Sequence, residues 1–324
     1  MSKGQQTVIA APVIAVESRQ TELAGAELSS VLRGRVRLHE PMARHTTFRI
    51  GGPADIFVQP ADVEDLAQAI RFSRNKGIPL KVIGNGSNLL VSDAGIRGIV
   101  VRLTPGFSAV RWLEDGVEVG GGARLAKLVR EASSVGLGGL ESTIGIPGTV
   151  GGALATNAGT DTGSVGNLVV SATVLGPDGE LREWSASQFS YRYRYSSLRA
   201  SGATVVAARL RLTPTPKEEI VAKVNRLWEK RAGRQPLRSW CAGSVFKNPR
   251  AVAAGKVLDR GGAKGRRIGG AQVSPKHANF LVNCGAATAE EMRELIEWAH
   301  ALALRKYGID LEPEIEFVGE RFAP

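Results

Sequence analysis

The chain has 324 residues and a formal net charge of +11 at pH 7, and 43% of its residues are hydrophobic while 23% are charged. A globular protein of this length can hold two or three domains. The composition excludes a membrane-spanning protein, because no apolar run approaches the ~18 residues that cross a bilayer, and no signal peptide is indicated. The two cysteines, Cys241 and Cys284, are typical of a reducing compartment, and the dispersed histidines predict no metal site.

The N-terminal third predicts an arm followed by alternating helices and strands. Residues 1–40 lack strong periodicity, so we expect a partly disordered arm with a short helix around Glu22–Leu32. From His45 to Pro60 the pattern predicts a strand, a Gly-Gly turn and a second strand. A helix capped by Asp62 and stopped at Gly77 follows, and then a strand at Leu80–Ile83.

A loop of small residues, GNGSN at 84–88, comes next and runs into the apolar residues Leu89–Val91. Asn and Ser side chains and a tightly turned backbone can donate to phosphate oxygens, which makes this loop a candidate phosphate cradle. The alternative is a plain hairpin loop. Beyond it we expect strands at Gly98–Leu103 and Gly116–Val119, and a helix at Arg124–Val135.

The stretch Gly136–Gly159 is the most unusual part of the sequence. It holds eight glycines and one charged residue, Glu141, and no Lys or Arg occurs between Arg130 and Arg182. Glycine at this density lets the backbone approach a ligand and offers free N–H groups to a flat or anionic group. A phosphate bound here would therefore be held by amides and hydroxyls. The alternative is a glycine-rich turn region that packs tightly in a core.

The remaining elements predict a second domain after a proline-rich break at 214–216. Before the break we expect a hairpin at Val169–Leu175 and Glu180–Trp184, and a strand at Val205–Leu212. After it we expect a helix at Lys217–Ala232 that ends at Gly233, a helix that starts at a Thr288–Glu291 capping box and stops at Gly308, and an extended segment at 311–319.

Positive charge is concentrated in residues 217–276, which contain 15 basic and four acidic residues and so account for the whole net charge. Such a block favours an anionic partner, either a small phosphorylated substrate or a nucleic acid, although a solvated basic surface is the alternative. Nucleic acid is disfavoured because no stacking aromatics are interleaved with the charges.

Three polar residues have no local structural explanation. Arg194 lies in a Tyr-Arg alternation that predicts a strand with Arg192 on the same face, Glu314 follows a proline in an extended run that places it beside Glu316, and Ser244 lies outside any expected helix. Near a flavin, an arginine and an acid can stabilise a developing enolate while a hydroxyl delivers a proton. The alternatives are a surface ion pair and a turn residue.

Seven motifs in the same order resemble the UDP-N-acetylenolpyruvoylglucosamine reductase family from about residue 40 to 319. They are HTTFRIGGPAD, GNGSNLLVSD, GLESTIGIPGTVGGALATNAG, YRYS, AGSVFKNP, AGKVLDRGGAKGRRIGGAQVSPKHANFLVN and LEPEIEFVG. The resemblance implies an α+β fold, with a two-lobed FAD-binding domain of the vanillyl-alcohol-oxidase type at 41–213 (lobes about 41–105 and 106–213). A smaller α+β substrate-binding domain at 217–319 and a tail at 320–324 complete it.

The resemblance also implies non-covalent FAD, NADPH as hydride donor and a UDP-sugar as substrate. Its proton-donating serine, its arginine and its final glutamate match Ser244, Arg194 and Glu314. Lys247 and Asn248 match family positions near the UDP group. The basic residue that precedes the serine in the family matches Arg234, with Arg238 as the alternative. The implied FAD contacts are Gly84, Asn85, Gly86, Ser87, Asn88, Leu89, Ile144, Gly145, Ile146, Pro147, Gly148, Gly151, Gly152, Asn157, Ala158 and Gly159.

Two features depart from the family pattern. The doubled YRYRYS makes Arg192 a competitor of Arg194, although the spacing to Ser196 favours Arg194. No tyrosine-bearing insertion occurs before the proline-rich break, which is similar to the shorter subclass of the family. We expect a cytoplasmic monomer that binds neither nucleic acid nor membrane; a related FAD-linked oxidase with a non-nucleotide substrate is the alternative enzyme.

Overall fold

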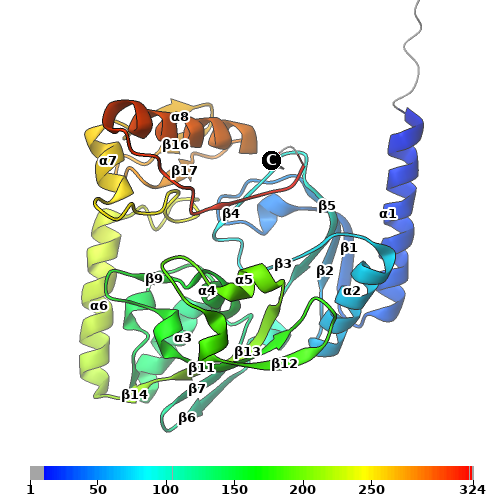
Figure 1. Ribbon diagram of the computed structural model, residues 1–324, viewed down its shortest axis with the longest axis horizontal. Coiled ribbons are helices and arrows are strands. Elements are labelled where there is room, and N and C mark those ends of the chain that lie inside the picture. The colour runs from blue at the N-terminus through cyan, green and yellow to red at the C-terminus, as the bar shows by residue number, and fades with distance from the viewer. Residues whose placement is uncertain (1–10, 104, 321, 323–324) are drawn as a thin grey trace, which may run out of the picture.

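The first lobe of the computed structural model, which describes residues 11–103, 105–320 and 322, is a sheet with helices packed on it (Figure 1). The sheet has the order β1-β2-β5-β3, with β1 antiparallel to β2 and the other pairs parallel. Its elements are α1 (Ala11–Val31), β1 (Arg35–Pro41), η1 (Met42–Arg44), β2 (Pro53–Gln59), α2 (Val63–Lys76), β3 (Leu80–Ile83), β4 (Leu89–Val91) and β5 (Ile96–Arg102).

The N-terminal arm differs from the prediction, because α1 is a 21-residue helix that begins at Ala11 rather than a short one at Glu22. Ala24, Leu28 and Leu32 are buried in the core of the first lobe, and Gly25 lies against the Leu38 side chain of β1. Packing on the sheet therefore stabilises a helix whose own sequence pattern is weak. Residues 1–10 of the expected arm lie outside the described residues.

Two local predictions in this lobe had different outcomes. The helix from Asp62 to Gly77 is confirmed: Asp62 accepts from the Asp65 N–H and Gly77 ends the helix in the left-handed conformation. The strand expected from His45 is wrong. The Thr46 hydroxyl donates to the Ile50 carbonyl and accepts from the Ile50 N–H, and this closes a turn instead.

Asp65 joins three segments of the first lobe from a buried position. Its carboxylate accepts backbone N–H bonds from Arg33, Gly34 and Ala61 at 3.1, 2.7 and 2.9 Å. Burial raises the pKa of this carboxyl, but the three N–H donors more than offset burial and leave the pKa below its usual value. The ionised form therefore stabilises the lobe at neutral pH.

We expect Asp65→Asn to lower the free energy of unfolding at pH 7 by about 1–3 kcal/mol, because an amide NH₂ would face N–H donors. Since the folded pKa lies below the unfolded one, the stabilisation is fully present above the ordinary carboxyl pKa and is lost as the pH falls through the folded pKa. Urea unfolding at pH 7 and at acidic pH measures this. The exposed Asp115→Asn is the control; a deficit that does not shrink in acid would contradict the prediction.

The second lobe is an antiparallel sheet in the order β12-β11-β13-β7-β6, with helices over one face (Figure 1). The predicted hairpin, the strand near 205–212 and the helix near 124–135 are confirmed, while β6 was not expected. The elements are η2 (Pro105–Phe107), β6 (Val110–Leu113), β7 (Gly116–Gly120), α3 (Leu125–Val135), β8 (Leu137–Gly138), η3 (Glu141–Thr143), α4 (Val150–Thr156), β9 (Gly159–Thr160), β10 (Gly163–Ser164), η4 (Val165–Leu168), β11 (Val169–Leu175), β12 (Leu181–Ser185), η5 (Ala186–Phe189), α5 (Ser197–Ser201), β13 (Thr204–Arg211) and β14 (Thr213–Pro214).

A long helix, α6 (Lys217–Arg234), connects the second lobe to the third body (Figure 1). It continues through Gly233, where we had expected it to end. Val224 and Leu227 pack against the core of the second lobe. Helix α6 therefore lies on the second lobe rather than standing apart from it, although the sequence places it after the proline-rich break.

The third body is a small sheet in the order β15-β16-β17 with helices beside it. The Thr288–Glu291 capping box and the stop at Gly308 are confirmed. Strand β18 leaves this body and pairs in parallel with β4 of the first lobe, and the core of the third body includes Phe48 and Leu90 of that lobe. Its elements are α7 (Ala254–Arg260), β15 (Arg267–Ile268), β16 (Ala271–Val273), β17 (Leu281–Asn283), α8 (Ala289–Tyr307) and β18 (Glu316–Val318).

The α+β class with two lobes and a smaller third body is as predicted, whereas the limits 41–213 and 217–319 stay predictions. The hydrophobic cores follow the three bodies, and a further small core joins Met42 and Phe57 to Val318. Within the described residues, no helix combines the length and the apolar character that crossing a bilayer requires.

Candidate active site

A cleft of about 1960 Å³ opens where the two lobes and the third body meet. It gathers residues from remote parts of the chain, including the predicted Arg194, Ser244 and Glu314. The expected UDP contacts Lys247, Asn248 and Arg234 also line it. The expected FAD contacts that line it are Gly84, Asn85, Gly86, Ser87, Asn88, Leu89, Gly145, Ile146, Pro147, Gly148, Gly152, Asn157, Ala158 and Gly159.

The GNGSN loop presents unused backbone donors to this cleft. In the part of the chain that the structure describes, no acceptor takes the N–H groups of residues 85–88. Gly86 adopts φ +59°, and its carbonyl accepts from the Thr47 N–H at 3.2 Å. Successive free amides at a tight turn form an anion-binding concavity. The loop is therefore suited to the diphosphate of a dinucleotide.

We expect Gly86→Ala to abolish retention of a dinucleotide, because an added Cβ would lie 2.0 Å from the His45 carbonyl oxygen and the left-handed conformation would be strained. The loop would have to move away from the first lobe. Flavin absorbance per protein after purification measures the loss. Gly77→Ala is the matched control: Gly77 also has a positive φ, with open space around it. Equal flavin content in both variants would contradict the role of the loop.

The glycine-rich stretch forms the opposite wall and contains a short helix, α4, that the sequence did not predict. Thr149 caps this helix by accepting from the Gly152 N–H at 3.3 Å. In the described chain, the N–H groups of Gly145 and Gly148 also reach no acceptor. Asn85 Nδ2 donates to the Pro147 carbonyl at 2.7 Å, so the two loops meet at one edge of the cleft.

Two of the expected FAD contacts do not line the cleft. Ile144 is buried in the core of the second lobe. Gly151 is held away from the cleft, because its N–H donates to the Gly121 carbonyl at 2.8 Å. Both residues pack within the glycine-rich stretch, which is the role that the alternative prediction gave to this stretch. The neighbouring residues line the cleft.

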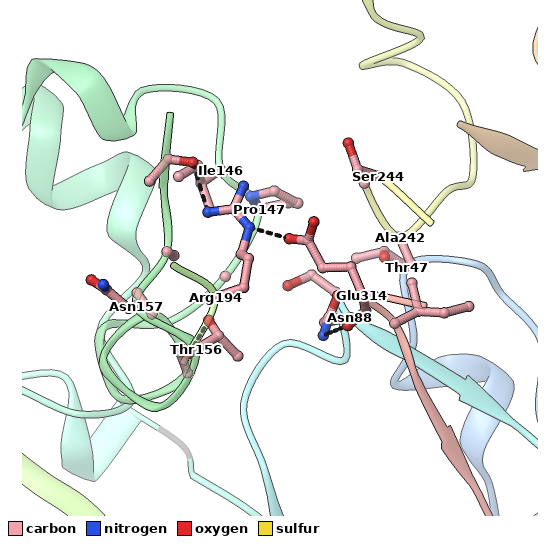
Figure 2. A pocket seen from close by; sticks show the side chains of 18 of the residues that line it. Thr47, Asn88, Ile146, Pro147, Thr156, Asn157, Arg194, Ala242, Ser244 and Glu314 are labelled. Atoms are coloured by element: carbon pink, nitrogen blue, oxygen red, sulfur yellow. Dashed lines mark hydrogen bonds and ion pairs between the residues drawn. The ribbon is translucent and has the colours of Figure 1, made fainter. Parts of the chain in front are cut away.

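Arg194 and Glu314 face each other across the cleft (Figure 2). The Nε atom of Arg194 lies 2.5 Å from Oε1 of Glu314, and both side chains are largely buried, with 21% and 17% exposure. Arg194 NH1 also donates to the Gly159 carbonyl at 3.1 Å. The pair therefore joins the second lobe to the C-terminal segment at the centre of the site.

The expected strand around Arg194 is wrong. Arg192 and Tyr195 exchange backbone hydrogen bonds, both 3.1 Å, and so close a tight turn in which Arg194 adopts φ +52°. The turn directs Arg194 into the cleft, whereas Arg192 lies over the Tyr195 ring and does not line the cleft. The geometry thus favours Arg194 over Arg192.

Burial raises the pKa of Glu314 above the usual carboxyl value, and the charges of Arg194 and Lys247 only partly offset it. A raised pKa favours the protonated carboxyl, which can donate a hydrogen bond to an oxygen. Its burial and its contact with Arg194 distinguish Glu314 from a solvated surface carboxylate.

Ser244 lies on the Glu314 side of the cleft, apart from the ion pair (Figure 2). Its segment is held by backbone bonds: Glu314 N–H donates to the Val245 carbonyl at 2.7 Å, and Val245 N–H donates to the Asn279 carbonyl at 2.9 Å. The buried Asn279 also holds Phe246 by its side-chain amide. The fold therefore fixes Ser244 and Glu314 relative to each other.

The expected UDP contacts have structural partners of their own. Lys247 pairs with Glu312. Asn248 Oδ1 accepts from the Ala254 N–H at 3.0 Å, and its own N–H donates to the Tyr193 hydroxyl at 3.1 Å. Arg234, the last residue of α6, lines the cleft. All three residues line the cleft, and their roles in substrate binding stay predictions.

Arg231 is a site residue that the sequence reasoning missed. Its NH1 donates to the Ile144 carbonyl at 2.6 Å, and burial, followed by the nearby Arg194, lowers its pKa. The glycine-rich stretch has no cations of its own, yet α6 and the Tyr-Arg turn supply two of them. Helical spacing could have identified Arg231, because it follows Val224, Leu227 and Trp228 on one face.

Comparisons with known proteins identify the family. Residues 54–185 match the FAD binding domain, and residues 235–318 match the C-terminal domain of UDP-N-acetylenolpyruvoylglucosamine reductase. The chain is 45% identical over 305 residues to the enzyme of that name from Moorella thermoacetica, covering 93% of this chain and 98% of that one. The chain belongs to the UDP-N-acetylenolpyruvoylglucosamine reductase family.

Other members of this reductase family agree in length and in structure. Reductase 2 of Symbiobacterium thermophilum is 41% identical over 294 residues, which are 90% of this chain and 96% of that one. The crystal structure of the reductase from Thermus caldophilus has a TM-score of 0.77 and 36% identity, covering 89% of this chain and 99% of that one. The family assignment makes this chain an FAD-dependent oxidoreductase, as the motifs predicted.

Proposed function

We propose that this protein uses NADPH and FAD to reduce the enolpyruvyl group of UDP-N-acetyl-3-O-(1-carboxyvinyl)-glucosamine, giving UDP-N-acetylmuramate for peptidoglycan precursor synthesis. The observation that carries the proposal is the convergence of Arg194, Glu314 and Ser244 on one cleft between two loops with free amides. A cytoplasmic location, a monomeric state and the absence of a nucleic-acid partner are part of the proposal.

The residues present fit FAD. The cleft is large and is walled on both sides by glycine-rich loops, whose free N–H groups suit a diphosphate. The GNGSN loop and the Gly145–Gly148 segment would hold the cofactor. When bound, FAD supplies hydride transfer from NADPH to a carbon of the substrate. The chain itself must orient the substrate and manage charge and protons.

Arg194, and Glu314 in its protonated form, stabilise negative charge as it develops on the substrate carboxylate and enolate oxygens, because both line the cleft and contact each other. Ser244 gives a proton to the carbon next to the carboxylate. A serine hydroxyl is a poor acid at neutral pH, so it needs a relay or a nearby cation, and Lys247 is the candidate. Asn279 keeps the Ser244 segment in place through the bonds described above.

The basic end of the cleft suits the UDP group. Its walls there come from the last turn of α6 and from the third body, and they include Arg234, Lys256, Lys264 and Lys276. Several cations around one opening attract a diphosphate and raise its local concentration. The excess of positive charge in residues 217–276 thus supports a small anionic substrate.

A visible absorption spectrum tests the proposal. The purified protein should be yellow, bleach when NADPH is added without oxygen, and regain its colour when the enolpyruvyl UDP-sugar is added. A protein that bleaches but is reoxidised by oxygen and not by the UDP-sugar would be a different flavoenzyme. A colourless protein that binds DNA with a steep salt dependence would contradict both.

A further inference from the structure

Strand β18 begins at Glu316, two residues after Glu314, and this second carboxylate pairs with two cations. Its Oε1 lies 2.5 Å from Lys81 Nζ, and its Oε2 lies 3.1 Å from Arg199 NH2. Lys81 belongs to β3 of the first lobe, and Arg199 belongs to α5 of the second. All three side chains line the main cleft. One carboxylate therefore joins both lobes to β18.

The backbone around the two glutamates is bonded to the GNGSN loop. The Glu316 N–H donates to the Asn88 carbonyl at 2.8 Å. Asn88 Nδ2 donates to the Glu314 carbonyl at 3.0 Å (Figure 2). Strand β18 also pairs in parallel with β4, which directly follows the loop. The first lobe therefore holds the backbone of both glutamates in place.

The arginines that meet these glutamates both belong to the second lobe. Arg194 lies in the Tyr-Arg turn, and Arg199 lies on α5, which begins three residues after Arg194. Leu198 anchors α5, because its side chain is buried in the core of the second lobe. Two ion pairs, Arg194–Glu314 and Arg199–Glu316, therefore connect the C-terminal segment to the second lobe.

The two ion pairs have different fates in the proposed reaction. Glu314 acts in its protonated form and Arg194 meets charge on the substrate, so the attraction between these two side chains weakens during turnover. The Glu316 contacts take no part in that chemistry. Glu316 is 27% exposed and Arg199 is 55% exposed, so a single pair here would contribute little, whereas one carboxylate held by cations from two lobes forms a network.

We propose that Glu316 is a positioning residue: its pairs with Arg199 and Lys81 keep the second lobe at the distance from β18 at which Arg194 and Glu314 both contact the substrate. A misplacement of about 1 Å at such a group can slow a reaction by about 10²-fold. The inference rests on the proposed reaction, and it assigns to the lobe contacts a role that the three site residues cannot fill themselves.

Stopped-flow absorbance of Glu316→Gln tests this role. We expect flavin reduction by NADPH to stay within about twofold of the wild type and reoxidation by the UDP-sugar to slow roughly 3–30-fold. Arg199→Met should behave in the same way, and Arg199→Lys should retain most of the rate. Glu320→Gln is the control, because Glu320 lies in the same segment and pairs with Arg97 of the first lobe at 3.7 Å. Equal slowing of both half-reactions, or no slowing of either, would overturn the proposal.

Combination with Arg194→Met separates positioning from a general structural role. If Glu316 acts through Arg194, adding Glu316→Gln to Arg194→Met should slow reoxidation little further, and multiplied losses would refute the role.

Urea unfolding gives a second readout that needs no substrate. The coupling between Arg194→Met and Glu314→Gln should fall by at least about half when Glu316→Gln is also present, because the pair is then no longer held in place. Unchanged coupling would contradict the positioning role even in an active enzyme. If the coupling falls but the UDP-sugar fails to reoxidise wild-type flavin, the proposed substrate is wrong and the role of Glu316 stands.

Discussion

Replacing Ser244 with alanine is expected to leave the reduction of bound flavin by NADPH almost unchanged and to slow its reoxidation by the UDP-sugar by about 10²–10⁴-fold. The reason is chemical: the first half-reaction moves a hydride and needs no proton for the sugar, while the second leaves a carbanionic carbon that must be protonated. Stopped-flow absorbance of the two half-reactions measures each rate separately.

The matched control for this variant is Ser239→Ala, because Ser239 lines the same cleft but lies outside the segment that is bonded to Asn279 and Glu314. We expect both of its half-reactions to stay near the wild-type rates. If Ser244→Ala slowed both half-reactions equally, the hydroxyl would serve cofactor binding or local structure rather than proton delivery. Ser244→Cys separates these cases further, since a thiol can still give a proton.

The sequence predicted those parts of the fold that local chemistry determines. Helix α2 is an example, because Asp62 and Gly77 satisfy its ends and its apolar stripe has helical spacing. Helix α1 was underestimated, since packing against Leu38 and the first sheet stabilises it and no local signal announces that contact. The pairing of β18 with β4 likewise joins residues more than 200 positions apart, and no single-sequence pattern encodes such a partner.

The candidate site, like the fold, was only partly predictable from the sequence. Motif resemblance identified Ser244, Arg194 and Glu314, and the structure brings them to one cleft. Motif resemblance did not identify Arg231, because this residue donates to the carbonyl of Ile144, which lies far from it in sequence. The absence of cations in the glycine-rich stretch had suggested a site held by amides and hydroxyls; the fold also brings Arg231 of α6 and Arg194 of the Tyr-Arg turn to this stretch.

Replacing Arg194 with methionine is expected to lower kcat by about 10²–10³-fold, since the guanidinium meets charge that develops only as the substrate is reduced. Arg192→Met should stay within a few-fold of the wild type, because Arg192 lies over the Tyr195 ring and outside the cleft. The two variants make the same chemical change at positions two residues apart, so each is the control of the other. Steady-state kinetics with the UDP-sugar measure both.

A double-variant cycle with Glu314→Gln then asks whether the pair acts as a unit. Removing Arg194 leaves a largely buried carboxyl whose pKa burial already raises, so Glu314 should be protonated over a wider pH range in Arg194→Met. If protonated Glu314 is the active form, the alkaline limb of the pH–rate profile of Arg194→Met should therefore shift to higher pH. If the effects of the two single variants were simply additive, Arg194 and Glu314 would contribute independently, and their 2.5 Å contact would be structural only.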